Sequence, residues 1–388
     1  MSKKRICIDI SNVIPGKGGS GGGIATYALH LIKGLNQITN INEFEIYCLK
    51  HPDFKGFENC VNIKIINIGI ENKKFLNRIY WTHIYLPFFC KRNKINILHR
   101  VTPELPLIKV CKYVCTLHDL MFDFYLSHHE IKKFLKKKEL IKYQLFAKIT
   151  RHAAWISDVI IVPTYSIKNE LVKNYKIKSE KIAVTYLAAE KRNDTEKANT
   201  KRNFEKIHIG VIAGFYPHKG HRKVMEMASQ FIQSGFTNFK ISFRGNPAFP
   251  DYIREILSLK ERLNLNDHIF IVPYEQKASL KEIYSEFDLI LLLSEYEGFG
   301  LPVLEAQTYE LPVFCSDIPV FKEILETSAY YIADKPDIST IKNIIADVQN
   351  QKLLQSLSEM GLSNLKKFSW EKMNIETISL YKKLITEN

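Results

Sequence analysis

Two glutamates, Glu297 and Glu305, stand eight positions apart and bracket a Gly-Phe-Gly turn and a proline. The apolar run at 288–293 before them is typical of a buried parallel strand, and Pro302 suits the first turn of a helix. Glycines let the backbone approach a ligand closely, and the free N–H groups of a helix start favour an anion. Phosphate-binding amides flanked by two hydroxyl-binding carboxylates would suit a sugar nucleotide. Taken alone, the pattern also fits a corner whose acids only favour the helix N-terminus electrostatically.

Two further segments place polar side chains directly after apolar runs. His118 and Asp119 follow the apolar stretch 113–117, which puts an imidazole and a carboxylate at the carboxyl edge of a predicted sheet. Lys219 ends the segment 214–219, which follows the apolar run 207–213. Taken alone, a His-Asp pair is usually structural.

The glycine-dense loop at 16–23 follows the first predicted strand and precedes a helix. It contains G-x-G-x-x-G at Gly16, Gly18 and Gly21, with Glu43 about 20 residues further on, which is the fingerprint of a dinucleotide-binding loop. In so glycine-dense a loop a chance match is expected, and a flexible turn without a ligand is a further interpretation.

Strand and helix patterns alternate in two series that a polar stretch separates. Strands are expected at 6–10, 44–49, 62–68, 95–99, 113–117 and 159–162 in the first series, and at 207–213, 240–243, 268–272, 289–293 and 313–315 in the second. Helices are expected at 24–35, 221–234, 252–263, 279–286, 320–325 and 371–386. Two successive βαβ series predict an α/β protein with two doubly wound parallel-sheet domains facing a cleft.

The charge of the chain is distributed unevenly. Residues 1–190 hold 30 Lys and Arg against 15 Asp and Glu, whereas residues 191–388 hold 25 against 26, so the net charge of +14 comes from the N-terminal half. Such asymmetry indicates a negatively charged surface or a phosphate-bearing substrate as partner. No apolar run approaches the ~18 residues of a membrane span. The seven cysteines are an odd number and include no C-x2-C pair, which predicts a reducing, cytoplasmic location.

Together these segments resemble the large family of retaining glycosyltransferases with the GT-B fold, the GT4-like or group 1 family. The string from Glu297 to Glu305 matches the family's E-x7-E element, with its internal G-F-G-L-P, residue for residue. The resemblance covers nearly the whole chain, tightly in the second half and loosely in the first. It implies an acceptor-binding Rossmann-like domain, a linker, a Rossmann-like domain for the nucleotide sugar, and a final helix that crosses back to the first domain. We place these parts at 1–187, 188–206, 207–367 and 368–388.

The resemblance also implies catalytic roles for three residues. His118 would orient a hydroxyl of the transferred sugar, Glu297 would hold hydroxyls near the reacting carbon, and Lys219 would contact the donor diphosphate. Glu305 would accept hydrogen bonds from the ribose. The donor-binding residues would be Gly22, Gly23, Lys219, Arg244, Tyr274, Glu297, Gly298, Phe299, Gly300, Leu301 and Glu305.

The chain departs from the family's pattern in the loop that ends at Lys219. Phe215 and His218 stand where basic residues are common, so the clamp on the leaving phosphate is thinner than usual, and Arg244 is a candidate to compensate. No metal or other cofactor is expected, because Lys219 and helix amides would take the place of a cation.

The segment 128–152 combines eight Lys and Arg with apolar residues at helical spacing. We interpret it as a single basic helix, which is either a solvated face or an interfacial helix on an anionic membrane. No nucleic-acid-binding motif is recognised, so nucleic acid is not an expected partner. The location would then be cytoplasmic, or peripheral on the inner face of the plasma membrane.

The expected activity is transfer of a hexose, mannose or another, from a GDP- or UDP-sugar to a saccharide or lipid-linked acceptor. The resemblance implies retention at the anomeric carbon and a role in lipopolysaccharide, O-antigen or capsule-type polysaccharide biosynthesis. Two alternatives stay open. The loop at 16–23 could serve an NAD-dependent oxidoreductase, and the nucleotide-sugar site could bind without catalysis.

Overall fold

The computed structural model describes residues 3–16, 22–38, 43–68, 75–190, 192, 206–272 and 279–386. These residues form two compact units, each with its own parallel sheet. The first unit comprises Met1–Leu126, Lys137–Leu187 and Ser369–Asn388, and the second comprises Ser127–Lys136 and Ala188–Phe368. The predicted linker at 188–206 falls mostly outside the described residues.

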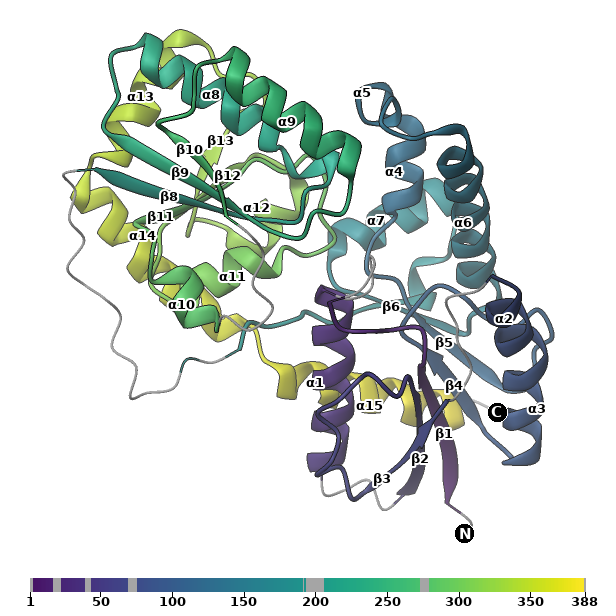
Figure 1. The fold of residues 1–388 in the computed structure, drawn as a ribbon. Coiled ribbons are helices and arrows are strands. Elements are labelled where there is room, and N and C mark those ends of the chain that lie inside the picture. Colours follow the sequence, from purple (N-terminus) through teal and green to yellow (C-terminus); the bar gives the residue numbers. More distant parts are fainter. Residues whose placement is uncertain are drawn as a thin grey trace. The chain divides into compact units, whose positions relative to one another are not determined.

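The sheet of the first unit has seven strands in the order β3-β2-β1-β4-β5-β6-β7, and every neighbouring pair is parallel (Figure 1). The strands are β1 (Lys4–Ile10), β2 (Phe44–Lys50), β3 (Ile63–Asn67), β4 (Ile97–Arg100), β5 (Lys112–Thr116), β6 (Val159–Val162) and β7 (Ile182–Val184). Strand order reverses between β1 and β4, so loops after these strands diverge and leave room for a ligand at the carboxyl edge.

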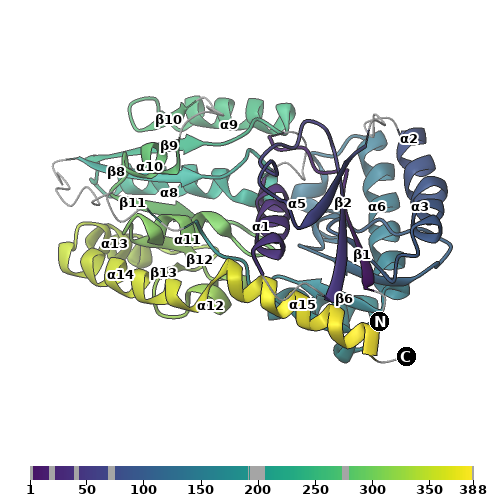
Figure 2. The ribbon, with the colours of Figure 1, turned by 90° about the horizontal axis from the view of Figure 1, so that it is seen from below.

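Helices cover both faces of this sheet. The helix α1 (Gly23–Gln37) and the final helix α15 (Trp370–Thr386) lie on one face, and Figure 2 shows them together. The other face carries α2 (Phe75–Tyr80), the π-helical turn η2 (Trp81–Tyr85), α3 (Leu86–Arg92), α6 (Lys137–Ile156) and α7 (Tyr165–Tyr175). The remaining elements of the first unit are α4 (Met121–Ser127) and the short turn η3 (Ser179–Lys181).

The sheet of the second unit has six strands in the order β10-β9-β8-β11-β12-β13, again all parallel. The strands are β8 (Ile207–Ile212), β9 (Phe239–Arg244), β10 (Ile269–Val272), β11 (Leu289–Leu292), β12 (Val313–Ser316) and β13 (Tyr330–Ile332). All residues of β11 and β12 are buried, because helices cover a parallel sheet on both faces. The two doubly wound sheets confirm the predicted fold class.

Helices cover both faces of this sheet as well. One face carries α8 (His221–Gln233) and α9 (Pro250–Arg262), and the other carries α10 (Leu280–Tyr284), α11 (Leu301–Thr308) and α12 (Pro319–Leu325) (Figure 1). The remaining elements are α5 (His129–Lys132), η4 (Pro217–Lys219), α13 (Ile338–Val348), α14 (Gln351–Asn364) and η5 (Leu365–Lys367).

The prediction of one continuous basic helix over 128–152 is wrong. The segment forms two helices, α5 and α6, with non-helical residues between them. The physical reason is that its apolar residues pack in different places. Ile131 is buried and Phe134 packs edge-on against Tyr252, with ring centroids 5.3 Å apart, so both anchor the first part in the second unit. The strands β7 and β13, both three residues long, were also missed by the sequence pattern.

Candidate functional site

Lys219 and Glu297 form an ion pair at the carboxyl edge of the second sheet. Lys219 lies after β8 and Glu297 lies after β11, and these two strands are neighbours in the sheet. The Lys219 Nζ donates to both carboxylate oxygens of Glu297, at 2.7 Å each. Ser294 donates its hydroxyl to Glu297 Oε1 at 2.8 Å. The structure thus brings together two residues that are 78 positions apart, at the point where strand order reverses.

A glycine holds the Lys219 loop close to β11. Gly220 has a φ of +71°, and a Cβ there would lie 1.9 Å from the carbonyl oxygen of Leu293. No other residue type fits so near a backbone carbonyl, so this close approach depends on the glycine. The sequence marks the position only as the end of the segment that carries Lys219.

The helix α11 begins at the second part of the motif. Gly300 is its N-cap with a φ of +94°, and Pro302 lies in its first turn, as predicted. The first N–H groups of any helix lack intrahelical acceptors, so this end offers amides to an anion. The side chain of Phe299 is buried and packs edge-on against Phe368, with ring centroids 5.9 Å apart. Only its backbone could therefore serve a ligand, together with those of Gly298 and Leu301.

Glu305 is held by a tyrosine that sequence reasoning missed. Tyr284 donates its hydroxyl to Glu305 Oε2 at 2.8 Å, and its buried ring stacks on Tyr309 with ring centroids 5.5 Å apart. Burial raises the pKa of the Glu305 carboxyl above its usual value, and the hydrogen bond from Tyr284 partly opposes that shift. The only sequence signal for Tyr284 is its place in the helix before β11.

Arg244 lies at the end of β9 and is bound by a carboxylate of the protein itself. Its Nη2 donates to both carboxylate oxygens of Glu286, at 3.0 and 2.8 Å. Its predicted contact with a donor stays a prediction.

Phe215 is buried and stacks on His221, with ring centroids 4.6 Å apart. His218 is also buried, and burial together with the charge of Lys219 holds its pKa well below the usual value, so it is neutral at pH 7.

The remaining predicted residues belong to the first unit or lie outside the described residues. Tyr274 is outside them, as is part of the loop at 16–23, whereas Gly22 and Gly23 stand at the start of α1. His118 follows β5 and contacts the ring of Tyr27 edge-on, with ring centroids 4.9 Å apart. Burial lowers the pKa of His118 to about 4, so its imidazole is neutral at pH 7 and can bond a hydroxyl.

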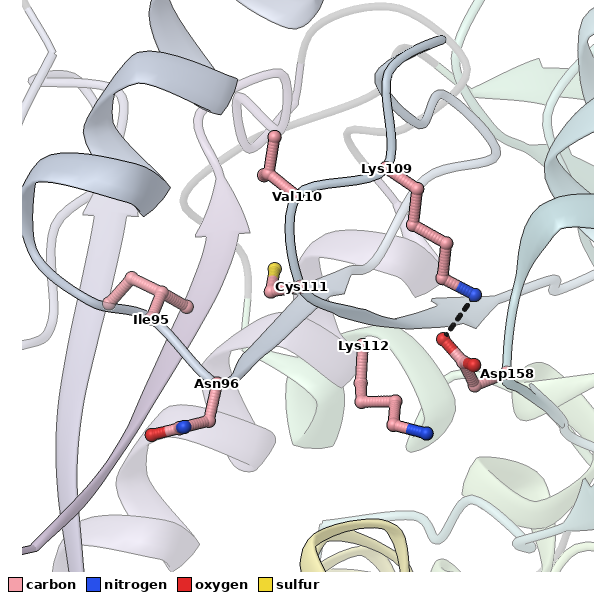
Figure 3. A pocket seen from close by; sticks show the side chains of 7 residues that line it. All are labelled: Ile95, Asn96, Lys109, Val110, Cys111, Lys112 and Asp158. Atoms are coloured by element: carbon pink, nitrogen blue, oxygen red, sulfur yellow. Dashed lines mark ion pairs between the residues drawn. The ribbon is translucent and has the colours of Figure 1, made fainter. Parts of the chain in front are cut away.

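A hollow of about 460 Å³ in the first unit lies away from these residues (Figure 3). It is lined by Ile95, Asn96, Lys109, Val110, Cys111, Lys112 and Asp158, with Lys109 Nζ 2.8 Å from Asp158 Oδ2. These residues precede or begin strands, so the hollow lies at the amino edge of the sheet.

Within the described ranges there is no group of three or more His, Cys, Asp or Glu that could hold a metal ion. The described helices also include none that is long and apolar enough to cross a membrane.

Two known families together match most of the chain. Residues 192–363 match the family described as Glycosyl transferases group 1, and residues 21–189 match the family described as Glycosyltransferase Family 4. The first match contains Lys219, Glu297 and Glu305, and the second contains His118.

Several known proteins are similar along most of their length. The O-antigen chain mannosyltransferase RfbU of Salmonella typhimurium is 25% identical over 336 residues, which cover 84% of this chain and 88% of that protein. The O-antigen biosynthesis glycosyltransferase WclY of Escherichia coli is 24% identical over 371 residues, or 92% of this chain and 94% of that protein. Among solved structures, WaaG, described as involved in lipopolysaccharide biosynthesis, has a TM-score of 0.71 at 13% identity and covers 99% and 100% of the two chains. Anabaena HepE, solved with UDP and glucose, has a TM-score of 0.67 at 14% identity over 98% and 100%.

Proposed function

Since the chain belongs to the GT4-like glycosyltransferases of group 1 and has their GT-B fold, we propose that it moves a hexose from a nucleotide sugar to a hydroxyl group of a saccharide or lipid-linked acceptor, with retention. The names of RfbU and WclY support a role in O-antigen or lipopolysaccharide biosynthesis. The name of RfbU favours mannose and hence GDP-mannose, whereas the UDP and glucose bound to HepE favour a UDP-hexose.

The observation that carries this proposal is the Lys219–Glu297 pair beside the start of α11. A diphosphate bound there would compete with Glu297 for the ammonium group of Lys219. Lys219 and the first amides of α11 would then stabilise the negative charge that develops as the bond between the sugar and the phosphate breaks. Glu297, still bonded by Ser294, would accept hydrogen bonds from sugar hydroxyls, and Glu305 would accept them from the ribose.

In the same scheme, the oxygen of the acceptor hydroxyl bonds to the anomeric carbon and its proton leaves with the departing diphosphate. His118 is neutral, so its imidazole could bond a sugar hydroxyl without carrying a positive charge. Because Lys219 and helix amides supply the charge stabilisation, we expect the reaction to proceed without a metal ion.

Donor binding and turnover test the proposal directly. Thermal shifts and sugar release are measured with UDP-, GDP-, ADP- and dTDP-sugars, with NAD as control. We expect one nucleotide sugar to raise Tm and to be hydrolysed slowly, and Lys219→Ala and Glu297→Ala to reduce turnover about 100-fold or more. The matched control is Lys223→Ala, because Lys223 is a nearby lysine that pairs instead with Glu295 and Asp334. A shift with NAD alone would favour an oxidoreductase, and a sugar-nucleotide shift without turnover would favour a binding protein.

The first unit carries a surface that suits an anionic membrane. Leu76, Tyr80, Ile84 and Phe88 are 76%, 48%, 59% and 58% exposed and recur every four residues along α2, η2 and α3. In an α-helix with 3.6 residues per turn, side chains four positions apart move gradually around the helix axis. The π-helical turn η2 has more residues per turn, so it rotates the chain less per residue and offsets this movement. The four side chains therefore point to one side. We call these four residues the apolar stripe.

Lysines lie on the helix next to the apolar stripe. The guanidinium of Arg78 on α2 lies 5.3 Å from the ring of Phe146 on α6, so the two helices are neighbours. The described side chains of α6 include exposed Ile141 and Leu145 and the exposed residues Lys137, Lys138, Lys142 and Lys148. Basic residues near an anionic lipid surface contribute about 1 kcal/mol each, and exposed apolar side chains can insert beside them. We therefore propose that this face binds the membrane that carries a lipid-linked acceptor.

Vesicle cosedimentation tests this contact. We expect binding to vesicles that contain phosphatidylglycerol, weaker binding as salt rises, and loss of binding in the double variant Ile84→Glu/Phe88→Glu. Val61→Glu is the control, because Val61 is 84% exposed in the same unit but lies outside the apolar stripe. Equal binding to neutral vesicles, or equal loss in both variants, would contradict the proposal.

A further inference from the structure

Four buried side chains form a continuous hydrogen-bonded chain through the first unit. The hydroxyl of Tyr381 on α15 lies 2.5 Å from His99 Nδ1, and His99 Nε2 lies 2.8 Å from Thr116 Oγ1. Thr116 Oγ1 lies 3.0 Å from the hydroxyl of Tyr27 on α1. None of the four is more than 2% exposed, so water does not compete for these bonds. We call this set the Tyr381–Tyr27 relay.

The relay ends at His118 by two routes. The ring of Tyr27 contacts the His118 imidazole edge-on, at an interplanar angle of 75°. Thr116 is the last residue of β5, two positions before His118. The imidazole is also hydrogen-bonded to the backbone of Val101, while its Nε2 is buried and has no hydrogen-bond partner among the described residues. The Tyr27 ring therefore helps to hold the imidazole while Nε2 is left for a substrate hydroxyl.

The bonds of the relay depend on one another. Burial lowers the pKa of His99 to about 3, so His99 is neutral at pH 7 and has one donor and one acceptor nitrogen. Either Tyr381 donates to Nδ1 and Nε2 donates to Thr116, or Thr116 donates to Nε2 and Nδ1 donates to Tyr381. In both cases the loss of one hydroxyl leaves a buried nitrogen or hydroxyl without its partner and weakens the remaining bonds.

We propose that Tyr27, Thr116, His99 and Tyr381 are positioning residues that hold the His118 imidazole in the orientation needed for transfer. Through the relay, turnover depends on the packing of the C-terminal helix α15. Its Tyr381 contacts His99, which is 282 residues earlier in the chain. This inference rests on the role proposed above for His118. A relay that only stabilised the fold would change Tm without changing kcat.

Single-atom changes separate these two roles. Tyr27→Phe keeps the ring and removes the hydroxyl, Thr116→Val removes a hydroxyl at constant shape, and Thr116→Ser keeps it. We expect Tyr27→Phe and Thr116→Val each to lower kcat about 10-fold with donor KM within about 2-fold, and Thr116→Ser to retain kcat near wild type. The control is Tyr113→Phe, because Tyr113 is a buried tyrosine of β5 whose hydroxyl donates to the Ile108 carbonyl, outside the relay. It should lower Tm and leave kcat unchanged.

The His118→Gln background shows whether the relay acts through His118. We expect Tyr27→Phe to have no further effect on the residual turnover of His118→Gln, because the group that it positions is already gone. In NMR spectra of histidine-labelled protein, the His118 resonance should move in Tyr27→Phe and Tyr381→Phe but stay in Tyr113→Phe. An unchanged kcat and unchanged resonance in Tyr27→Phe would overturn the relay while leaving the proposed transfer intact. A wild-type protein that binds and hydrolyses no nucleotide sugar would instead overturn the proposed function.

Discussion

At the scale of single residues, each carboxylate of the candidate site accepts a hydrogen bond from a partner within the protein. Glu297 is bonded by Lys219 and Ser294, and Glu305 by Tyr284. A diphosphate would compete with Glu297 for Lys219, whereas Ser294 and Tyr284 can keep their bonds while the two carboxylates accept further hydrogen bonds. The motif predicts both glutamates, but their partners come from strands and helices that only the folded sheet brings together.

At neutral pH, the charged Glu305 carboxylate should lower the free energy of unfolding, although the same carboxylate is proposed to bind the nucleotide. Its pKa is raised by burial, so the folded protein binds this proton more tightly than the unfolded chain. The stability from this group is full below about pH 4.5 and is lost as the pH rises through the raised pKa. We expect Glu305→Gln, which keeps an acceptor for Tyr284, to have a higher Tm than wild type at pH 8 and the same Tm near pH 4.

The substitution that raises Tm at pH 8 should weaken nucleotide binding. Glu305→Gln should bind the donor nucleotide roughly 10-fold more weakly in calorimetry, because hydrogen bonds to a charged acceptor are stronger than those to a neutral one. Glu376→Gln is the matched control, since burial also raises the pKa of Glu376, which lies on α15. Unchanged nucleotide affinity in Glu305→Gln would show that the ribose assignment is wrong.

At the scale of elements, the start of α11 depends on a backbone conformation that L side chains rarely adopt. Gly300 has a φ of +94°, and a Cβ there would lie 2.8 Å from the Phe321 ring. We expect Gly300→Ala to destabilise the protein by about 2–4 kcal/mol, from backbone strain plus the collision, and to weaken donor binding because the α11 amides shift. Chemical denaturation and donor titration measure the two effects.

Gly235 provides the control for the backbone term. Its φ of +84° is similar, but a Cβ there would meet nothing within 4 Å. Gly235→Ala should therefore cost only about 1 kcal/mol and leave donor affinity unchanged. Equal destabilisation by the two variants would show that the Phe321 contact does not position α11.

Glu310, just after α11, also adopts a left-handed backbone conformation, with a φ of +59°. Its carboxylate lies 2.8 Å from Arg192, and Ser358 donates to its carbonyl oxygen. These contacts hold the turn that follows α11, outside the Lys219–Glu297 pair.

At the scale of the whole molecule, the last helix belongs to the unit that contains the first strand. Asn374 on α15 donates to the His30 carbonyl oxygen at 3.2 Å, and a Cβ on Gly34 of α1 would lie 2.1 Å from the Asn374 amide nitrogen. Gly34 is thus the position that lets α15 pack against α1. The first unit combines segments that are more than 300 positions apart in the sequence, so its stability depends on the contact between α1 and α15.

The effect of Gly34→Ala on the free energy of unfolding should depend on the side chain at position 374. We expect Gly34→Ala to destabilise wild type by about 1–3 kcal/mol through overpacking. In an Asn374→Ala background the same change should stabilise by up to about 1 kcal/mol, because the space is free and alanine favours a helix. A double-mutant cycle by urea denaturation measures this. If the two substitutions changed the free energy of unfolding additively, the contact between Gly34 and Asn374 would not contribute to stability.

The sequence by itself determined most strands of the two series, the start of α11 at Pro302, and the motif residues Glu297, Glu305 and Lys219. These depend on periodicity and turn chemistry within short windows, which folding does not alter. Tertiary structure alone decided which partners meet, such as Arg244 with Glu286 and His99 with Tyr381. It also divided the basic segment 128–152 between two units. Such contacts depend on which faces pack together across tens or hundreds of residues, and no local pattern contains that information.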